Sequence, residues 1–289
     1  MSCTVYTDGV KKVTPQQKPI NLNGPLILNE KDAHVVDEIV APAEAQVKRG
    51  VTVHEGYRFV CLGETGSGKT ALMRVVVYST LARGLAGYAL VHDTKNIWPE
   101  YPRNLQVVNV AAFLRTGFPD GHIPAVSFRG DPRRDVEVSA EEVASFSLQL
   151  ARRGRVVNGQ WHTSPHVTVI EELSEAASAG RKRLNAPSVL KLLEQGRKMG
   201  VSLVGTTQSP ANVPLDILRQ ASSIAFFRLT GPDVNYLRER LHLDEDLIRT
   251  ISGQSSEGLP NHSFALYVKG KVWDKQVYSL DKRTALMFE

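Results

Sequence analysis

The sequence GETGSGKT, residues 63–70, carries residue types that bind phosphate. It has the spacing G-x-x-x-x-G-K-[ST], directly after an apolar run and at the start of an amphipathic stretch. In this pattern backbone amides converge on phosphate oxygens, Lys69 reaches the β- and γ-phosphates, and Thr70 ligates Mg²⁺. The alternative is a glycine-rich turn with a surface lysine, and the flanking strand and helix signals argue against it. The residues predicted to bind the nucleotide are Gly63, Glu64, Thr65, Gly66, Ser67, Gly68, Lys69 and Thr70.

Two carboxylates end a second apolar run, VTVIEEL, residues 167–173. A strand that ends in this way places both at the carboxyl edge of the sheet, where open α/β sheets bind ligands. One carboxylate can hold Mg²⁺ and the next can polarise an attacking water, as phosphoryl transfer requires. We assign Glu171 to the metal and Glu172 to the water. The alternative is two solvated glutamates at a helix start, where the helix dipole favours them.

The stretch EQGRKMGVSLVGTTQSP, residues 194–210, places polar groups at both ends of an apolar strand. If this strand lies beside the one ending in Glu171, Gln208 emerges at the same edge, where its amide can sense phosphate or water. Arg197 ends the preceding helix, too far from its own phosphate loop to act there, and can enter a neighbouring subunit's site as an arginine finger. The alternative for Arg197 is a cation favoured by the helix C-terminus.

Two basic segments can contact a polyanion through phosphates without reading bases. The clusters are Arg181, Lys182 and Arg183 in AGRKRLNAP, and Arg152, Arg153 and Arg155 in ARRGRVVNGQ. A solvated surface loop is the alternative for each cluster. The chain has 35 Lys and Arg against 30 Asp and Glu, a formal net charge of +5, which is compatible with a polyanionic partner but does not require one.

From residue 57 onward apolar runs alternate with amphipathic stretches, the pattern of βαβ units around a parallel sheet. The expected strands are residues 57–62, 87–92, 105–108, 125–128, 167–170, 201–206 and 223–228. The expected helices are residues 69–83, 140–152, 188–199, 215–220 and 232–241. Ser139 and Glu142 have the spacing of a capping box for the second helix. Residues 263–270 and 271–280 have the pattern of an antiparallel hairpin at the sheet edge.

The first 50 residues carry four prolines and no long periodic run, so we predict an extension formed by an arm and a short helix, with the core domain at residues 51–289. No window reaches the roughly 18 uninterrupted apolar residues of a membrane span, and the N-terminus lacks the order of a secretory signal. Two cysteines are too few for a disulfide framework. These features predict a cytoplasmic protein without a membrane span, and no zinc-ligand spacing is present.

The order of these motifs resembles the HerA-FtsK superfamily of P-loop DNA translocases. The resemblance rests on GETGSGKT, an apolar strand ending in EE, GRKMGVSLVGTTQSP and SSIAFFRL, and it covers about residues 55–230. In that superfamily a strand ending in Gln-x-Pro follows a helix whose terminal Arg acts in trans, positions held here by Gln208, Pro210 and Arg197. Asp93 and Lys95 match its D-x-K. The chain departs from the family in having Glu-Glu where Asp-Glu is usual.

The resemblance implies a RecA-like P-loop NTPase of the α/β class, with a mainly parallel central sheet flanked by helices and an antiparallel C-terminal edge hairpin. It also implies ATP hydrolysis with Mg²⁺. The chain lacks the membrane helices and winged helix of the chromosome translocases, and its first 50 residues are too irregular for the barrel of the repair-type members. This small build is similar to the genome-packaging ATPases of membrane-containing double-stranded DNA viruses, which work as homohexameric rings.

The expected partners are therefore double-stranded DNA, further copies of the chain in a hexameric ring, and a membrane or capsid-vertex protein. The expected location is the host cytoplasm or the virion vertex. In ring translocases the region around Arg181 faces the DNA channel. The alternatives are a conjugation or mobile-element DNA-transfer ATPase, and a virion morphogenesis or export ATPase that does not bind DNA. A small-molecule kinase would not need Gln208 or an arginine acting in trans.

Overall fold

The structure is a computed structural model. It describes residues 32, 34–43, 46–48, 51–53, 55–93, 125–128, 136–152, 155–157, 160–162, 165–177, 187–252 and 259–280. Its strands are β1 (Gln46–Lys48), β2 (Val51–Val53), β3 (Arg58–Leu62), β4 (Tyr88–His92), β5 (Ala125–Phe128), β6 (Arg155–Val157), β7 (Gln160–His162), β8 (His166–Ile170), β9 (Val201–Thr207), β10 (Ser223–Phe226), β11 (Ser263–Val268) and β12 (Val277–Ser279).

The α-helices are α1 (His34–Val40), α2 (Lys69–Ala82), α4 (Val136–Arg152), α5 (Leu173–Ala176), α6 (Pro187–Gln195), α7 (Leu215–Gln220), α8 (Gly231–Leu241) and α9 (Glu245–Ile251). The described part of the chain also has the short 3₁₀ turns η2 (Ala41–Ala43), η4 (Gly196–Met199) and η5 (Pro210–Asn212). None of the helices in the described part of the chain is long and apolar enough to cross a membrane.

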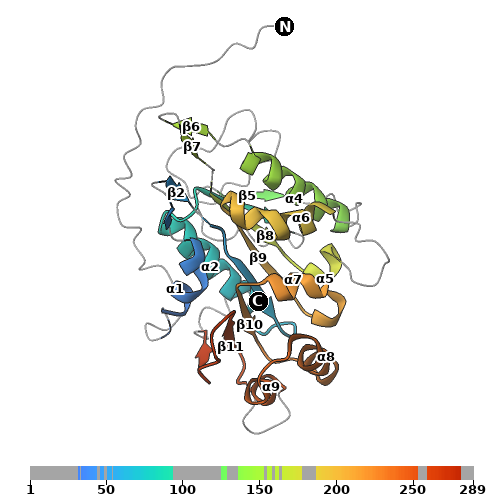
Figure 1. The fold of residues 1–289 in the computed structure, drawn as a ribbon. Coiled ribbons are helices and arrows are strands. Elements are labelled where there is room, and N and C mark those ends of the chain that lie inside the picture. The colour runs from blue at the N-terminus through green and yellow to red at the C-terminus, as the bar shows by residue number, and fades with distance from the viewer. Residues whose placement is uncertain are drawn as a thin grey trace.

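Eight strands form one sheet in the order β12-β11-β10-β3-β9-β8-β4-β5 (Figure 1). The pairs from β10 to β5 are all parallel, whereas β11 and β12 are antiparallel to their neighbours. Strand β9 lies between β3, which precedes the phosphate-binding motif, and β8, which precedes the paired carboxylates. The carboxyl ends of these three strands therefore meet at one edge of the sheet.

Helices cover both faces of the sheet, with α1 and α2 on one face and α4 to α9 on the other. Strand β3 shows how the two cores are divided. Phe59 and Cys61 lie in the core with α1 and α2, whereas Val60 and Leu62 lie in the core with α6 to α9. Because both faces are buried, the strands read as nearly continuous apolar runs, which is the pattern that the sequence shows.

The predicted α/β architecture is confirmed, including the mainly parallel sheet and the antiparallel edge hairpin, which is β11 paired with β12. Strand β10 ends at Phe226, two residues before the predicted end, and the last turn of the predicted helix at 188–199 is the 3₁₀ turn η4. Helix α9 was not predicted, although Asp244 caps it by accepting a hydrogen bond from Asp246 N at 2.8 Å. The predicted strand at 105–108 lies outside the described residues.

The predicted capping box of Ser139 and Glu142 is wrong, because α4 already begins at Val136. Ser139 lies inside the helix, where its hydroxyl donates to Val136 O at 2.9 Å and bonds with His92 Nε2 at 2.6 Å. The serine therefore forms a buried hydrogen bond with β4 and does not cap the helix.

The predicted N-terminal extension is described only in part. Helix α1 lies within it, and Val35 and Ile39 of α1 are buried in the same core as α2. Residues 1–31 lie outside the described residues, and the boundary near residue 50 stays a prediction.

Candidate active site

The phosphate loop, residues 63–70, joins β3 to α2 in a form that requires glycine. Gly66 and Gly68 have φ angles of 72° and 104°, in the left-handed region that side chains disfavour. At Gly63 an added Cβ would lie 2.5 Å from Phe227 Cβ, so the loop can pass this close to the chain after β10 only without a side chain. The loop is further anchored by Gly63 N, which donates to Thr207 O at 3.3 Å.

The ammonium group of Lys69 lies within this loop. The residue is 7% exposed, and its Nζ donates to the backbone carbonyl of Glu64 at 2.6 Å. Ser67 Oγ is also buried and, within the described part of the chain, makes no hydrogen bond. A buried cation, an unused hydroxyl and the start of a 14-residue helix fit a bound polyphosphate.

Glu172 follows β8 with a carboxylate that is held from three directions. Its Oε1 accepts from Ser174 Oγ at 2.6 Å, Thr207 Oγ1 at 3.1 Å and Gln208 N at 3.1 Å. Its backbone has φ 50° and ψ 70°, a left-handed conformation that is uncommon for a residue other than glycine. Such strain occurs often at active sites, and here it turns the chain from β8 into α5.

Gln208 connects this carboxylate with the phosphate loop. Its backbone N–H donates to Glu172, and its side-chain Oε1 accepts from Thr65 Oγ1 at 2.7 Å. The contact exists because β9 lies between β3 and β8, so the residue after β9 touches the ends of both neighbours. The structure therefore brings together three predicted site elements: the phosphate loop, Glu172 and Gln208.

Glu171 and Thr70 are the predicted magnesium ligands. Glu171 is 4% exposed at the end of β8, and Thr70 is half-buried in the first turn of α2. Among the described residues no group of three or more His, Cys, Asp or Glu side chains can hold a metal ion. Mg²⁺ commonly takes one or two protein ligands and completes its shell with phosphate oxygens and water, so these two oxygen donors fit an ion bound together with a nucleotide.

His92 lies next to this edge, at the end of β4, and is fully buried. Burial lowers its pKa to about 4, against the opposing effects of Asp93 and of the Glu171 backbone. The imidazole is therefore neutral at physiological pH and adds no positive charge beside the carboxylates.

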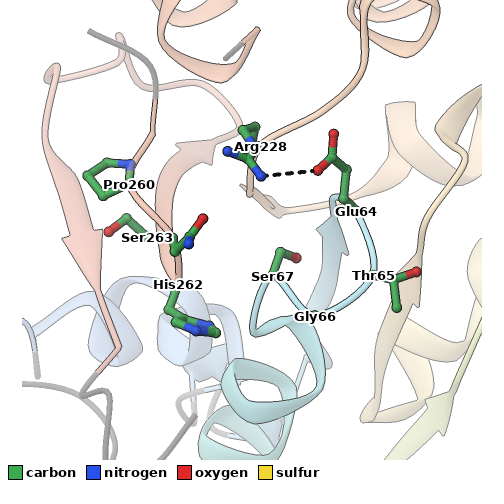
Figure 2. Close-up of a pocket in the computed structure, with 9 residues that line it drawn as sticks. Glu64, Thr65, Gly66, Ser67, Arg228, Pro260, His262 and Ser263 are labelled. Atoms are coloured by element: carbon green, nitrogen blue, oxygen red, sulfur yellow. Dashed lines mark hydrogen bonds and ion pairs between the residues drawn. The ribbon is translucent and has the colours of Figure 1, made fainter. Parts of the chain in front are cut away.

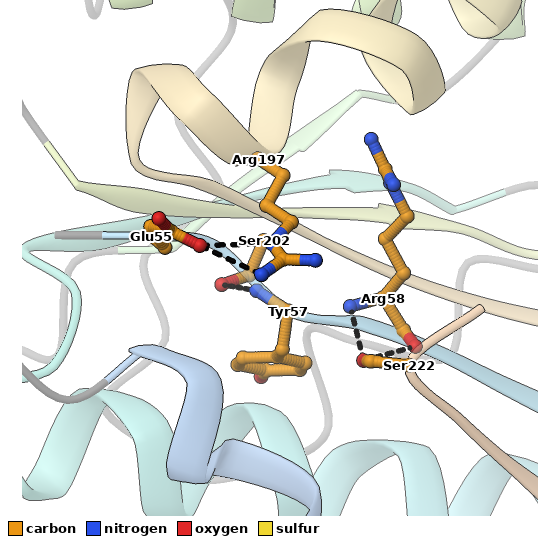
Figure 3. Close-up of polar contacts among 6 residues, drawn as sticks. All are labelled: Glu55, Tyr57, Arg58, Arg197, Ser202 and Ser222. Atoms are coloured by element: carbon orange, nitrogen blue, oxygen red, sulfur yellow. Dashed lines mark hydrogen bonds and ion pairs between the residues drawn. The ribbon is translucent and has the colours of Figure 1, made fainter. Parts of the chain in front are cut away.

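Arg197 lies at the opposite edge of the sheet, in η4 just before β9, and Figure 3 shows its side chain next to Glu55. Residues 198–207 separate it from Gln208, and the seven residues of β9 among them span roughly 20 Å at about 3.3 Å per residue. Its guanidinium pairs with Glu55 Oε2 at 2.7 Å from Nη2 and 3.1 Å from Nε. Burial of the neighbouring Arg58, together with repulsion from Arg197, lowers the pKa of the Arg58 guanidinium. Arg197 is thus remote from its own phosphate loop, and its role in a neighbouring subunit stays a prediction.

The predicted DNA contacts are described only in part. Arg152 is the exposed last residue of α4, and Arg155 begins β6, where its side chain is not described. The other four predicted contacts lie outside the described residues: Arg153, Arg181, Lys182 and Arg183.

Sequence reasoning missed three residues at this edge. Thr207 donates to Glu172, while Arg228 and His262 line a cavity of about 380 Å³ beside the phosphate loop (Figure 2). One signal was present for Arg228, since the apolar run SSIAFF ends in a charged residue just as VTVI ends in Glu171. Thr207 and His262 had no comparable signal, because their roles depend on which strands are neighbours.

Neither a protein-family model nor a curated protein matches the sequence. Solved structures do. The genome-packaging NTPase B204 of Sulfolobus turreted icosahedral virus 2, in complex with ATP-gammaS, aligns with a TM-score of 0.53 and 16% identity over 78% of this chain and 97% of that chain. The DNA-packaging ATPase B204 of Sulfolobus turreted icosahedral virus gives 0.51 and 16% over the same shares.

A third similar structure is VirB4 of Thermoanaerobacter pseudethanolicus, with a TM-score of 0.50 and 10% identity over 78% of this chain and 89% of that chain. The fold is that of a RecA-like P-loop NTPase. At these identities the likeness shows the fold alone. These neighbours are consistent with the predicted resemblance to HerA-FtsK-type ATPases.

Proposed function

We propose that the chain is an ATPase that hydrolyses ATP between the phosphate loop and Glu172. The observation that carries this proposal is the chain of contacts from Glu172 Oε1 to Gln208 N, and from Gln208 Oε1 to Thr65 Oγ1 in the phosphate loop. It links the carboxylate suited to activate water with the loop suited to hold phosphate. The solved complex of a structural neighbour with ATP-gammaS supports the choice of nucleotide.

Each residue has a defined part in this proposal. The loop amides and the N-terminus of α2 bind phosphate oxygens, and Lys69 exchanges the Glu64 carbonyl for a phosphate oxygen. Glu172 orients a water and accepts its proton, because three donors fix one carboxylate oxygen and leave the other available for the water. Thr70 and Glu171 hold Mg²⁺, which supplies charge neutralisation at the phosphates. Gln208 responds to the phosphate state through Thr65.

We further infer that the ATPase works as a homohexameric ring that moves double-stranded DNA, as a viral genome-packaging motor. The similar structures of two viral packaging NTPases, each covered over 97% of its length, support this function. The position of Arg197 agrees with a ring, because at the edge of the sheet away from its own phosphate loop it could act only in a neighbour's site; the alternative is a structural arginine paired with Glu55. Its partners are then double-stranded DNA, copies of itself and a membrane or capsid-vertex protein, and its place is the host cytoplasm or the virion vertex.

Two alternative roles keep the same active site. The similarity to VirB4 also supports a conjugation or mobile-element DNA-transfer ATPase. DNA binding by the basic clusters around Arg181 and Arg152 would distinguish either DNA motor from a morphogenesis or export ATPase that does not bind DNA. Neutralising Arg181, Lys182 and Arg183 together should weaken DNA binding and reduce the log–log salt slope by about 0.9 per lost phosphate contact.

The test of the proposed function is hydrolysis with and without double-stranded DNA. Lys69→Ala should abolish hydrolysis with the fold retained, because its role at the phosphates is electrostatic. The matched control is Lys271→Ala, which removes an exposed lysine paired with Glu38 at 3.4 Å and should leave hydrolysis unchanged. Normal turnover by Lys69→Ala would refute the active site. Hydrolysis that DNA does not stimulate would favour the morphogenesis role over the DNA motor.

A further inference from the structure

A carboxylate of the same subunit holds the side chain of Arg197 at its edge of the sheet. Glu55 Oε2 accepts from Arg197 Nη2 at 2.7 Å and from Arg197 Nε at 3.1 Å (Figure 3). The side chain of Glu55 is 18% exposed, and that of Arg197 is 48% exposed. The carboxylate is therefore mostly covered, whereas the arginine remains accessible to another molecule.

The backbone on both sides of this pair is fixed as well. Arg197 O accepts from Gly56 N at 2.9 Å and from Gly200 N at 3.1 Å. An added Cβ on Gly56 would lie 1.9 Å from Val201 O, so only glycine lets the segment after Glu55 pass this close to β9. The two side chains are thus presented to each other by backbone segments that are themselves bonded together.

A second arginine, Arg58, acts on Arg197 from β3. Burial lowers the pKa of the Arg58 guanidinium, and repulsion from Arg197 lowers it further, against the attraction of Glu194. Figure 3 shows Arg58 and Glu55 to either side of Arg197. Because the repulsion is mutual, Arg58 disfavours positions of the Arg197 guanidinium closer to itself, while Glu55 favours the position that the structure shows.

The pairing engages one edge of the guanidinium and leaves the other. A guanidinium has five N–H donors, and Glu55 takes two of them, on the edge formed by Nε and Nη2. The adjoining edge, formed by Nη1 and Nη2, has the geometry that pairs with two oxygens of a phosphate. A planar fork can therefore bind a carboxylate and a phosphate at once, each in a fixed direction.

We propose that Glu55 is the positioning residue for Arg197 and holds the guanidinium by one edge so that the other edge meets the terminal phosphate in a neighbouring subunit's site. This inference rests on the proposed function, and it adds a residue of the arginine's own subunit on which the contact in trans depends. A displacement of about 1 Å can cost about 10²-fold in rate, so a loosely held arginine would lose much of its effect. Because it lies at the same edge as Arg197, Glu55 acts only through the arginine.

The first experiment measures hydrolysis and ATP affinity separately. Glu55→Ala should lower kcat by about 10- to 100-fold and leave ATP affinity within about twofold, because the arginine acts on the transition state. Glu55→Gln keeps the shape of the side chain and should lower kcat by about threefold to tenfold, since a neutral acceptor binds an arginine less strongly. When Arg197 is already alanine, Glu55→Ala should lower kcat no further.

A matched control tests for the general effect of removing a surface ion pair. Glu245→Ala removes a glutamate that pairs with Arg238 Nε at 3.2 Å, and it should hydrolyse ATP like the wild-type protein. Thermal denaturation of every variant reports its folding.

Mixed rings then show in which subunit's site Glu55 acts. Rings of Glu55→Ala and Lys69→Ala subunits should regain hydrolysis, because the Lys69→Ala subunits supply an intact pair of Glu55 and Arg197 to sites with an intact phosphate loop. Rings of Glu55→Ala and Arg197→Ala subunits should hydrolyse no faster than the average of the two separate proteins, because no subunit holds the arginine correctly.

The opposite pattern, recovery with Arg197→Ala but none with Lys69→Ala, would overturn the inference, because Glu55 would then serve its own subunit's site. Recovery in neither mixture would assign Glu55 a structural role, and faster hydrolysis by Glu55→Ala would mean that it restrains the arginine. Failure of the proposed function gives a different result. The reference rings of Arg197→Ala and Lys69→Ala subunits would then show no recovery, and the role of Glu55 would fall with action in trans.

Discussion

The substitution Glu172→Gln tests the water-activating carboxylate with the smallest change in shape. The amide keeps one oxygen for the three donors that hold Glu172 Oε1, namely Ser174, Thr207 and Gln208 N. A hydrogen bond to a charged group contributes about 1.5–3 kcal/mol, compared with about 0.5–1.5 for a neutral one, so three bonds weaken by about 3 kcal/mol together. Removal of a buried charge offsets part of this loss. We therefore expect the free energy of unfolding to change by less than about 2 kcal/mol.

Hydrolysis should be affected much more strongly. Loss of a general base lowers the rate by about 10²- to 10⁴-fold, which corresponds to a barrier higher by about 3–5 kcal/mol. ATP affinity should stay within about threefold of wild type, because the phosphate loop is unchanged. A tenfold change in affinity corresponds to about 1.4 kcal/mol of binding free energy. The assay is single-turnover hydrolysis together with an equilibrium measurement of ATP binding.

Two comparison variants sharpen this test. Glu175→Gln neutralises an exposed carboxylate in α5, three residues further along, and should leave hydrolysis unchanged. Glu172→Ala removes the acceptor for Thr207 and Gln208, so it should also disturb the contact between Gln208 and the phosphate loop. A single-turnover rate of Glu172→Gln within fivefold of wild type would refute the assignment of the base. Loss of ATP binding in a folded variant would assign Glu172 a metal-binding or structural role.

Three further predictions follow from the geometry. Arg197→Ala and Lys69→Ala proteins should each be inactive alone but regain partial hydrolysis when rings are assembled from mixed monomers. The recovery should be measurable, because an arginine finger contributes about 10³-fold or more in rate. Confirmed mixed rings without activity would argue against action in trans. Burial lowers the pKa of His92 to about 4 from 6.5, so the free energy of unfolding should fall by at most about 3 kcal/mol as the pH drops from 6.5 to 4. Urea unfolding of His92→Asn should show no such dependence of stability on pH. Gly205→Ala places a Cβ 2.6 Å from Leu173 Cδ1 and should lower the free energy of unfolding, measured by urea unfolding, by about 1–3 kcal/mol. Unchanged stability would mean that the Leu173 side chain of α5 can move away from the new methyl group.

Local patterns in the sequence determined the individual elements of this protein. The motif GETGSGKT is contiguous in the sequence, and its glycines permit the left-handed backbone that Gly66 and Gly68 adopt. Apolar runs bounded by polar residues predicted β3, β8 and β9 to within one residue at each end. These features depend on neighbours in the chain, and for this reason the sequence alone indicated them.

Tertiary structure decided how these elements combine. The insertion of β9 between β3 and β8 brings Gln208 to Thr65 across 143 residues, and the return of the chain along β10 brings Arg228 to Glu64 across 164. The start of α4 was mispredicted for the same reason, since Ser139 bonds to His92 on another element instead of capping its own helix. Strand order depends on how all the strands, helices and connections of the chain pack together, which no local pattern encodes.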